Sequence, residues 1–235
     1  MYGRFPRSLL LALLLSTPAW AETVTLTPSK DNTLFESPTG SESSGSGTDV
    51  YTGQTVHEGV RRALLAFDVS VIPSDALIDS VSLELSLTHV SDPGPSPIRI
   101  YRVLADWGEG ASVSPLGDGA PSQAGDATWI HTFYPGSFWS KPGGDFSSTA
   151  SDSTDVQGFG TWIWHSAGLA SDVHAWTSQT AANYGWIMIG QEGGSRTARG
   201  FSSSEGGTPP RLVVHYSVAT PVNHTTWGKI KIRYR

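Results

Sequence analysis

The run SVSLELSLT at residues 80–88 alternates between apolar and polar side chains, and this pattern leaves few folds open to the chain. In an extended strand, successive side chains point to opposite faces. The valine and the three leucines therefore share one face, and the serines, the glutamate and the threonine share the other. A strand of this kind belongs to a sheet with one buried and one solvated face.

Short runs of similar character recur along the chain and predict an all-β fold. They are TVTLTP, DVYTG, RRALLAFDV, PIRIYRVL, TWIHTF, GTWIWH, YGWIMIG and PRLVVHY. Gly, Pro, Ser, Asp and Asn separate them, as is typical of strands joined by tight turns. About nine antiparallel strands in one domain predict a two-sheet antiparallel β-sandwich of jelly-roll type. The chain has no Cys, so its core must hold this fold without disulfides.

One segment, GLASDVHAWTSQ, has the period of a helix. Leu169, Val173 and Trp176 recur at spacings of four and three residues, which places them on one helix face. Ser171 or Asp172 is able to cap the first turn. The sequence therefore predicts one short helix, packed over an edge or end of a sheet.

Residues 1–21 have the three parts of a secretory signal. Arg4 and Arg7 precede an apolar run at 9–15, and the segment ends in the small-x-small triplet AWA. We expect cleavage after Ala21 and export of the remaining chain. The apolar run is shorter than the roughly 20 residues that cross a bilayer, so no integral membrane segment is expected. Residues 22–217 then form one domain.

The charge of the chain changes after this domain. Residues 22–217 carry 21 acidic and nine basic side chains, a formal charge of −12. This charge disfavours nucleic-acid binding, because phosphates are neutralised by clustered Lys and Arg. Residues 218–235 contain no acid and predict a linker and a basic tail, either a passive solvated end or an attachment element. The candidate attachment residues are Trp227, Lys229, Lys231, Arg233 and Arg235.

The string DNTLFE at residues 31–36 resembles the hexapeptide that names the DNRLRE domain family. It matches at four positions and departs at Thr33 and Phe35. Further similar segments follow in the family's order: RRALLAFDVSVIPSDALIDSVSLELSL, YRVLADWGEGAS, GDATWIHTFYPGSFWSKPGGDF, LASDVHAW, NYGWIMIG and PPRLVVHY. The resemblance covers roughly residues 24–216.

This resemblance implies a secreted, non-catalytic β-sandwich of jelly-roll type, found on bacterial extracellular and surface proteins. Some relatives are classed as carbohydrate-binding modules, attached to enzymes that degrade acidic polysaccharides such as alginate. Many others have no assigned ligand.

The aromatic segment at residues 125–146 holds most of the candidate carbohydrate-binding residues. Trp139 lies in an expected irregular loop, where no strand face covers it, so its indole is the candidate platform for a sugar ring. Lys141 and Arg102 are the candidate partners of a sugar carboxylate. Trp129 and His131 share one face of the expected strand TWIHTF, where Trp129 is either core or a second platform.

Other aromatic and acidic residues favour structural roles. GTWIWH places Trp162 and Trp164 on one face, and we expect these indoles to fill the interior of the sandwich. Asp106 and Glu109 in ADWGEGAS are spaced so that two carboxylates are able to meet. We expect them instead to accept hydrogen bonds from turn N–H groups, with Trp107 anchoring the turn.

Calcium is the candidate cofactor. Asp31, Asn32 and Glu36 are the candidate ligands, because Ca²⁺ binds carboxylate, amide and backbone oxygens. Zinc is disfavoured, since the seven His are scattered and no pair has a ligand spacing such as HxxxH.

Three functions stay open at this point. The first is a non-catalytic protein that binds extracellular or cell-surface carbohydrate, with acidic polysaccharide as the candidate partner. The second is a structural or adhesive surface protein without a small ligand, which requires buried strand-borne Trp side chains. The third is a polysaccharide-degrading enzyme built from residues such as His131, Tyr134 and Arg102, although no nucleophile elbow or phosphate loop is present. We expect the functional residues to lie mainly in the long loops at 110–125 and 136–158.

Overall fold

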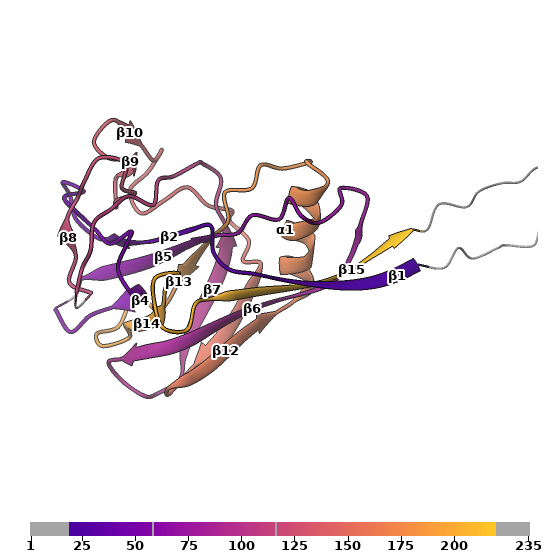
Figure 1. Ribbon diagram of the computed structural model, residues 1–235. Helices are drawn as coiled ribbons and strands as arrows, with labels where there is room; N and C mark the ends of the chain where they lie inside the picture. Colours follow the sequence, from indigo (N-terminus) through magenta and orange to yellow (C-terminus); the bar gives the residue numbers. More distant parts are fainter. Residues whose placement is uncertain (1–18, 58, 116, 220–235) are drawn as a thin grey trace, which may run out of the picture.

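The computed structural model describes residues 19–57, 59–115 and 117–219. This part of the chain is mostly antiparallel strand with one helix, so the predicted all-β, sandwich-like fold is confirmed (Figure 1). The elements, in chain order, are β1 (Ala19–Leu26), β2 (Lys30–Phe35), β3 (Glu42–Ser43), β4 (Asp49–Gln54), β5 (Val60–Ala66), β6 (Leu77–Val90), β7 (Ser96–Arg102), β8 (Ala120–Pro121), β9 (His131–Phe133), β10 (Ser137–Phe138), β11 (Asp152–Val156), β12 (Gly160–His165), α1 (Ala167–Thr177), β13 (Trp186–Ile189), β14 (Arg199–Ser202) and β15 (Arg211–Ala219).

Eleven of these strands form one curled sheet, whose two halves we call sheet A and sheet B. Sheet A joins β1, β15, β6, β12 and β14, and sheet B joins β2, β5, β13, β7 and β11. Strand β4 belongs to both halves. It pairs with β14 from Asp49 to Thr52 and with β5 at Gly53 and Gln54. The bend in β4 therefore carries the chain from one sheet to the other.

The main core lies between the two sheets. The alternation predicted for β6 is confirmed, since its four apolar residues at 81–87 are at most 5 % exposed. Strand β15 adds Leu212 and Val214 to the same core, and sheet B contributes residues such as Leu65, Ile100 and Trp186. Burial of these side chains on the facing sides of both sheets is the dominant favourable contribution to the fold.

A second core covers the outer face of sheet B. Strand β5 is apolar on both faces: Leu65 belongs to the main core, whereas Leu64 belongs to the second. Trp107, Trp129 and Trp139, from the long connection between β7 and β11, complete this second core. Sheet B is therefore buried on both faces, and the loops that cover it form a third layer.

Helix α1 packs against β6 through the three predicted residues Leu169, Val173 and Trp176, all of which are buried. The predicted cap was wrong. Ser166 is the N-cap, and its Oγ accepts the N–H of Leu169 at 3.2 Å. Among the described residues, no helix is long and apolar enough to span a bilayer.

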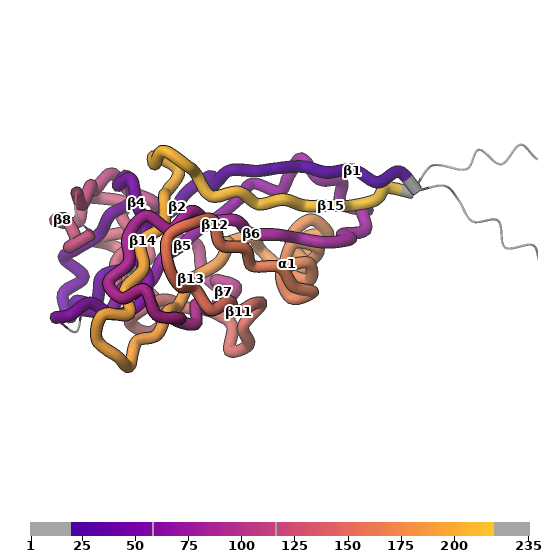
Figure 2. The backbone as a smooth tube through the Cα atoms, turned by 90° about the horizontal axis from the view of Figure 1, so that it is seen from below, coloured from indigo at the N-terminus to yellow at the C-terminus, as the bar shows by residue number. Residues whose placement is uncertain are grey.

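The two ends of the described chain lie together. Strands β1 and β15 pair from Ala19 and Ala219 to Leu26 and Leu212, and Figures 1 and 2 show them side by side as they leave the body. These strands extend past the predicted domain limits at residues 22 and 217. The candidate tail residues Trp227, Lys229, Lys231, Arg233 and Arg235 lie outside the described residues.

Candidate functional site

Trp139 is not the exposed platform that the sequence predicted. Its side chain is 5 % exposed, and its Nε1 donates to the carbonyl oxygen of Thr128 at 2.9 Å. The expectation was wrong because the loop folds back over the outer face of sheet B, where the indole gains apolar neighbours and an acceptor. The neighbouring Phe138 points outward instead and is 61 % exposed.

Trp129 and His131 are also buried. Trp129 belongs to the second core, which confirms the core interpretation for this side chain. His131 Nδ1 lies 2.8 Å from Thr128 Oγ1, and its ring packs against Tyr134 and Phe138 at centroid distances of 5.0 and 4.6 Å. Burial lowers the pKa of His131 below its ordinary value, so this imidazole is neutral at pH 7.

The two predicted carboxylate-binding cations have different neighbours. Lys141 is exposed, with Nζ 5.2 Å from the ring centroid of Phe146. Arg102 is half-buried, and its Nη1 lies 3.8 Å from Oδ1 of Asp172 on α1. Neither Lys141 nor Arg102 has a described contact with Trp139, so the three residues do not form the predicted sugar site. Arg102 also has no described contact with His131 or Tyr134, the other two residues of the enzyme alternative.

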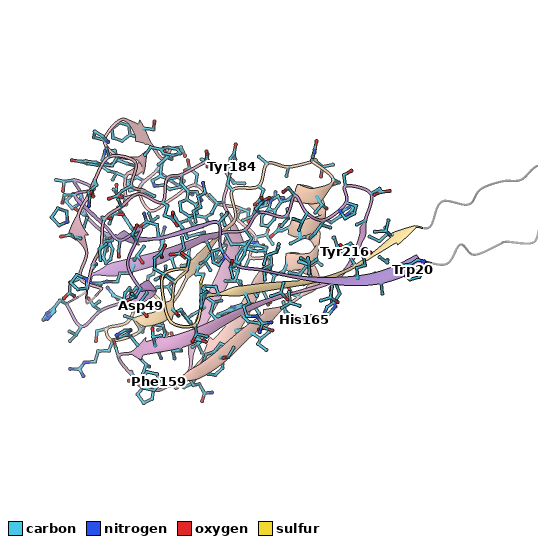
Figure 3. All side chains as sticks on the ribbon, in the orientation of Figure 1. Trp20, Asp49, Phe159, His165, Tyr184 and Tyr216 are labelled. Carbon is cyan, nitrogen blue, oxygen red and sulfur yellow. The ribbon has the colours of Figure 1, made fainter. Side chains whose placement is uncertain are left out.

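The described Trp side chains are mostly interior. Trp164 is fully buried, as predicted, and Trp162 is half-buried beside the main core. Trp20 is 70 % exposed at the far end of β1, and Phe159 is equally exposed at the turn between β11 and β12 (Figure 3). The buried set is Trp107, Trp129, Trp139, Trp164, Trp176 and Trp186.

The three predicted calcium ligands do not converge. Asp31 and Asn32 are successive residues of β2, so they point to opposite faces of sheet B, and Glu36 is exposed beyond the strand end. Asn32 Oδ1 accepts Ser43 Oγ–H at 3.0 Å, and its Nδ2 donates to a backbone carbonyl. Within the described residues, no three His, Cys, Asp or Glu side chains are grouped to hold a metal ion.

Asp31 is the most perturbed carboxyl group described. It is fully buried and accepts the N–H of Ser204 at 2.8 Å through Oδ2, whereas its Oδ1 has no hydrogen-bond partner among the described residues. Burial, together with the nearby Glu205 and Glu109, raises its pKa to about 7. Glu109 Oε1 accepts the N–H of Asp31 at 2.9 Å, so its partner is a residue of β2 and not, as the sequence predicted, an N–H group of its own turn.

Asp106 and Trp107, in contrast, have their predicted roles in this turn. Asp106 Oδ1 accepts the N–H of Trp107 at 2.9 Å and contacts Lys30 Nζ at 2.7 Å. Trp107 is fully buried, and its Nε1 donates to Tyr184 O at 2.8 Å. These two residues anchor the turn to sheet B.

A pocket of about 760 Å³ opens beside the bend of β4, and we call it the Tyr51 pocket. Its volume is in the range of small-molecule sites. Four segments far apart in the sequence form it, and no residue of the pocket was predicted as a site residue. Its lining is Tyr51, Thr55, Val56, His57, Gly59, Arg61, His89, Val90, Ser91, Gly117, Asp118, Arg196, Ala198 and Gly200.

Two glycines make room for the ring of Tyr51 in this pocket. Gly200 stands opposite Tyr51 in the β14–β4 register, and a Cβ there would lie 2.6 Å from the Tyr51 ring. A Cβ on Gly117 would lie 2.5 Å from the same ring, and Gly117 has a left-handed φ of 72°. Burial, aided by Asp49, raises the pKa of Tyr51 to about 12, so its hydroxyl stays protonated at neutral pH.

Two arginines give the pocket its positive charge. Arg61 donates from Nε to Gly117 O at 2.7 Å and from Nη1 to Gly59 O at 3.1 Å. Its Nη2 lies 3.5 Å from Oδ1 of the exposed Asp118. Arg196 is exposed and makes no ion pair with any described residue. It therefore presents an open cation.

Hydroxyl and imidazole groups line the pocket beside these arginines. Thr55 and Ser91 contribute hydroxyl groups, and His57 and His89 contribute imidazoles. His89 lies 5.6 Å from Tyr51, ring centroid to ring centroid, and its Nδ1 is 3.8 Å from Asp49 Oδ1. The arrangement suits a ligand with many hydroxyl groups and at least one negative charge.

The signal for this pocket in the sequence was weak. Only Gly117 and Asp118 fall in a loop, 110–125, that was expected to carry function. Tyr51, His89 and Gly200 meet because three strands of sheet A bring them into register. Residue types and spacing along one strand do not contain that information.

No protein-family model matches the chain, and no curated protein is significantly similar to it. The fold and the site together define an all-β, sandwich-like protein with a polar pocket lined by two arginines.

Proposed function

We propose that this chain is a secreted, non-catalytic jelly-roll β-sandwich that binds acidic carbohydrate of the extracellular space or cell surface in its Tyr51 pocket. The single observation that carries the proposal is the pocket itself, whose lining includes the Tyr51 ring, hydroxyl groups and two guanidinium groups. The resemblance to the DNRLRE domain family and the signal-like residues 1–21 favour the same function.

The chemistry of the pocket supports a sugar that carries a carboxylate. Hydroxyl and imidazole groups are able to donate to and accept from sugar hydroxyls. Arg196 at the rim is free to form a charge-assisted hydrogen bond with a carboxylate. The domain charge of −12 opposes long-range attraction of a polyanion, so we expect a modest affinity that falls less with increasing ionic strength than the affinity of a basic protein does.

Catalysis has less support than binding. Of the described residues that line the pocket, Asp118 is the one carboxylate, whereas glycoside hydrolysis generally uses two. The pKa of about 12 for Tyr51 makes its phenol a weak source of phenolate for proton abstraction.

A structural or adhesive protein without a small ligand is the second candidate. The observation in its favour is the burial of Trp164 and Trp186, which leaves Trp20, at the far end of β1, as the one largely exposed indole on the described strands. The two candidates differ in whether the Tyr51 pocket is ever occupied.

Binding to an array of neutral and acidic glycans, followed by calorimetry, tests the proposal. We expect acidic glycans to bind. The double variant with Arg196→Ala and Tyr51→Phe should have an affinity for them at least tenfold lower. Arg99→Ala is the matched control, because Arg99 is exposed on β7 and outside the pocket. Equal binding by the double variant and the wild type excludes this pocket, and sustained product release favours an enzyme.

A further inference from the structure

The Tyr51 pocket contains an ion pair between a buried cation and an exposed anion. The Arg61 side chain is 9 % exposed, whereas that of Asp118 is 85 % exposed. Arg61 Nε and Nη1 donate to backbone carbonyls of Gly117 and Gly59. The third nitrogen, Nη2, instead contacts a solvent-exposed side chain, that of Asp118.

The loop that carries Asp118 is held by its backbone. Gly117 accepts from Arg61, and the N–H of Gly119 donates to Ser114 Oγ at 3.0 Å. Both glycines have left-handed φ values, 72° and 88°, a conformation that glycine adopts without strain. The Asp118 side chain is thus able to turn away from Arg61 while the loop keeps its position.

Arg61 does not depend on Asp118 for its charge. Glu42 on β3 also acts on it electrostatically, and burial lowers its pKa from a very high ordinary value. An arginine remains protonated at neutral pH under such conditions. If the Asp118 carboxylate moves away, the Arg61 guanidinium therefore stays positively charged and is able to bind another anion.

We propose that Asp118 is a specificity-determining residue of the Tyr51 pocket, because its carboxylate holds Arg61 Nη2 until a ligand carboxylate replaces it. This inference rests on the proposed function. An ion pair with one largely solvent-exposed partner is weak, so a ligand carboxylate that is held by further hydrogen bonds displaces the Asp118 carboxylate. A neutral sugar offers no anion for Arg61 and must leave the pair intact, which separates acidic from neutral ligands.

The test compares the wild type with Asp118→Asn in titrations with a trimer of galacturonic acid and the equivalent trimer of galactose. Asp155→Asn is the matched control, since Asp155 is exposed on β11, outside the pocket, and changes the net charge equally. We expect Asp118→Asn to bind the acidic trimer about three- to fivefold more tightly. We expect unchanged affinity for the galactose trimer and wild-type behaviour of Asp155→Asn.

The guanidinium ¹⁵N resonances of Arg61 provide a second readout. They should shift with the acidic trimer and not with the neutral one. If Asp118→Asn binds the acidic trimer as tightly as the wild type or more weakly, this inference is overturned and the proposed function is not. Asp118 would then be inert or would contact the sugar directly. Failure of both trimers to bind either protein overturns the inference and the proposed acidic-carbohydrate function together. Asp118→Ser repeats the comparison if the asparagine variant unfolds.

Discussion

Arg62 and Glu192 form a two-point ion pair, with Nε 2.6 Å from Oε1 and Nη2 2.8 Å from Oε2. The same guanidinium lies 4.8 Å from the ring centroid of Trp129 and donates to Gly143 O at 2.7 Å. Arg62 therefore joins β5 to the loop layer over sheet B and to the chain after β13. One side chain therefore connects three segments of the chain beside the second core.

We expect Arg62→Lys to lower the free energy of unfolding by about 1–2 kcal/mol, because an ammonium cannot reproduce the two-point contact or lie flat on the indole. Urea unfolding measures the change. Arg99→Lys, at an exposed position of β7, is the control and should alter stability by less than about 0.5 kcal/mol. Equal effects of the two substitutions would contradict this account of Arg62.

The fold was predictable where the sequence pattern matches the packing directly. The period of β6 identified its buried face, and Leu169, Val173 and Trp176 identified the buried face of α1. These patterns work because each element buries a single face, so its own residues report which face is covered.

The candidate site was not predictable in this way. Trp139 was expected to be exposed because its loop has no strand period, yet a loop becomes interior when it covers a sheet. The apolar Leu64 and Ala66, on the outer face of β5, were the available sign that sheet B needs such a cover. Tyr51 and Gly200 meet through strand register across 149 positions of sequence, which no local pattern records.

Asp31 should make stability depend on pH. Its pKa is about 7 in the folded protein, whereas its ordinary value is 3.8. Between pH 3.8 and pH 7, the folded state therefore keeps a proton on Asp31 that the unfolded state has lost. The resulting stabilisation is fully present below about pH 4 and is lost as pH rises to 7. We expect Asp31 to lower the free energy of unfolding by on the order of 1 kcal/mol for each pH unit of that rise.

Asp31→Asn removes this titration and keeps an oxygen that is able to accept from Ser204 N. Urea unfolding between pH 4 and 8 should give a flatter profile for the variant than for the wild type. The slopes are compared rather than the absolute stabilities, because the added amide hydrogens change stability equally at every pH. Parallel profiles would show that Asp31 titrates normally in the folded protein.

Gly200→Ala should close the Tyr51 pocket. The added Cβ would lie 2.6 Å from the Tyr51 ring and 2.9 Å from His89 Cβ, so the ring must move. We expect a loss of about 1–3 kcal/mol in the free energy of unfolding and weaker binding of acidic glycans. Gly207→Ala is the control, since a Cβ there meets no atom within 4 Å. Wild-type stability of Gly200→Ala would contradict the described position of Tyr51.

A chain that begins at Glu22 should be as stable as one that begins at Ala19. Cleavage after Ala21 removes the three terminal pairs of β1 with β15, which bury little because Trp20 is 70 % exposed. It keeps the other five pairs and the hydrogen bond of 2.9 Å from Tyr216 Oη to Glu22 Oε2. We expect the two melting temperatures to agree within about 2 °C. The intact mass of exported protein identifies the start, and a mass that includes residues before Glu22 refutes the predicted cleavage.

The basic tail should act in attachment rather than in folding. Truncation after Ala219 removes the tail residues but leaves every β15 pair with β1 and β6 intact, so we expect unchanged thermal stability. Truncation after Tyr216 would also remove Ser217, which pairs with Leu77 of β6, so it could change folding as well as attachment. If Lys229, Lys231, Arg233 and Arg235 meet an anionic cell-surface component, the truncated protein should leave the cell surface for the medium. Replacing the four basic residues with Gln should have the same effect, and an identical distribution of all three forms would refute attachment by the tail.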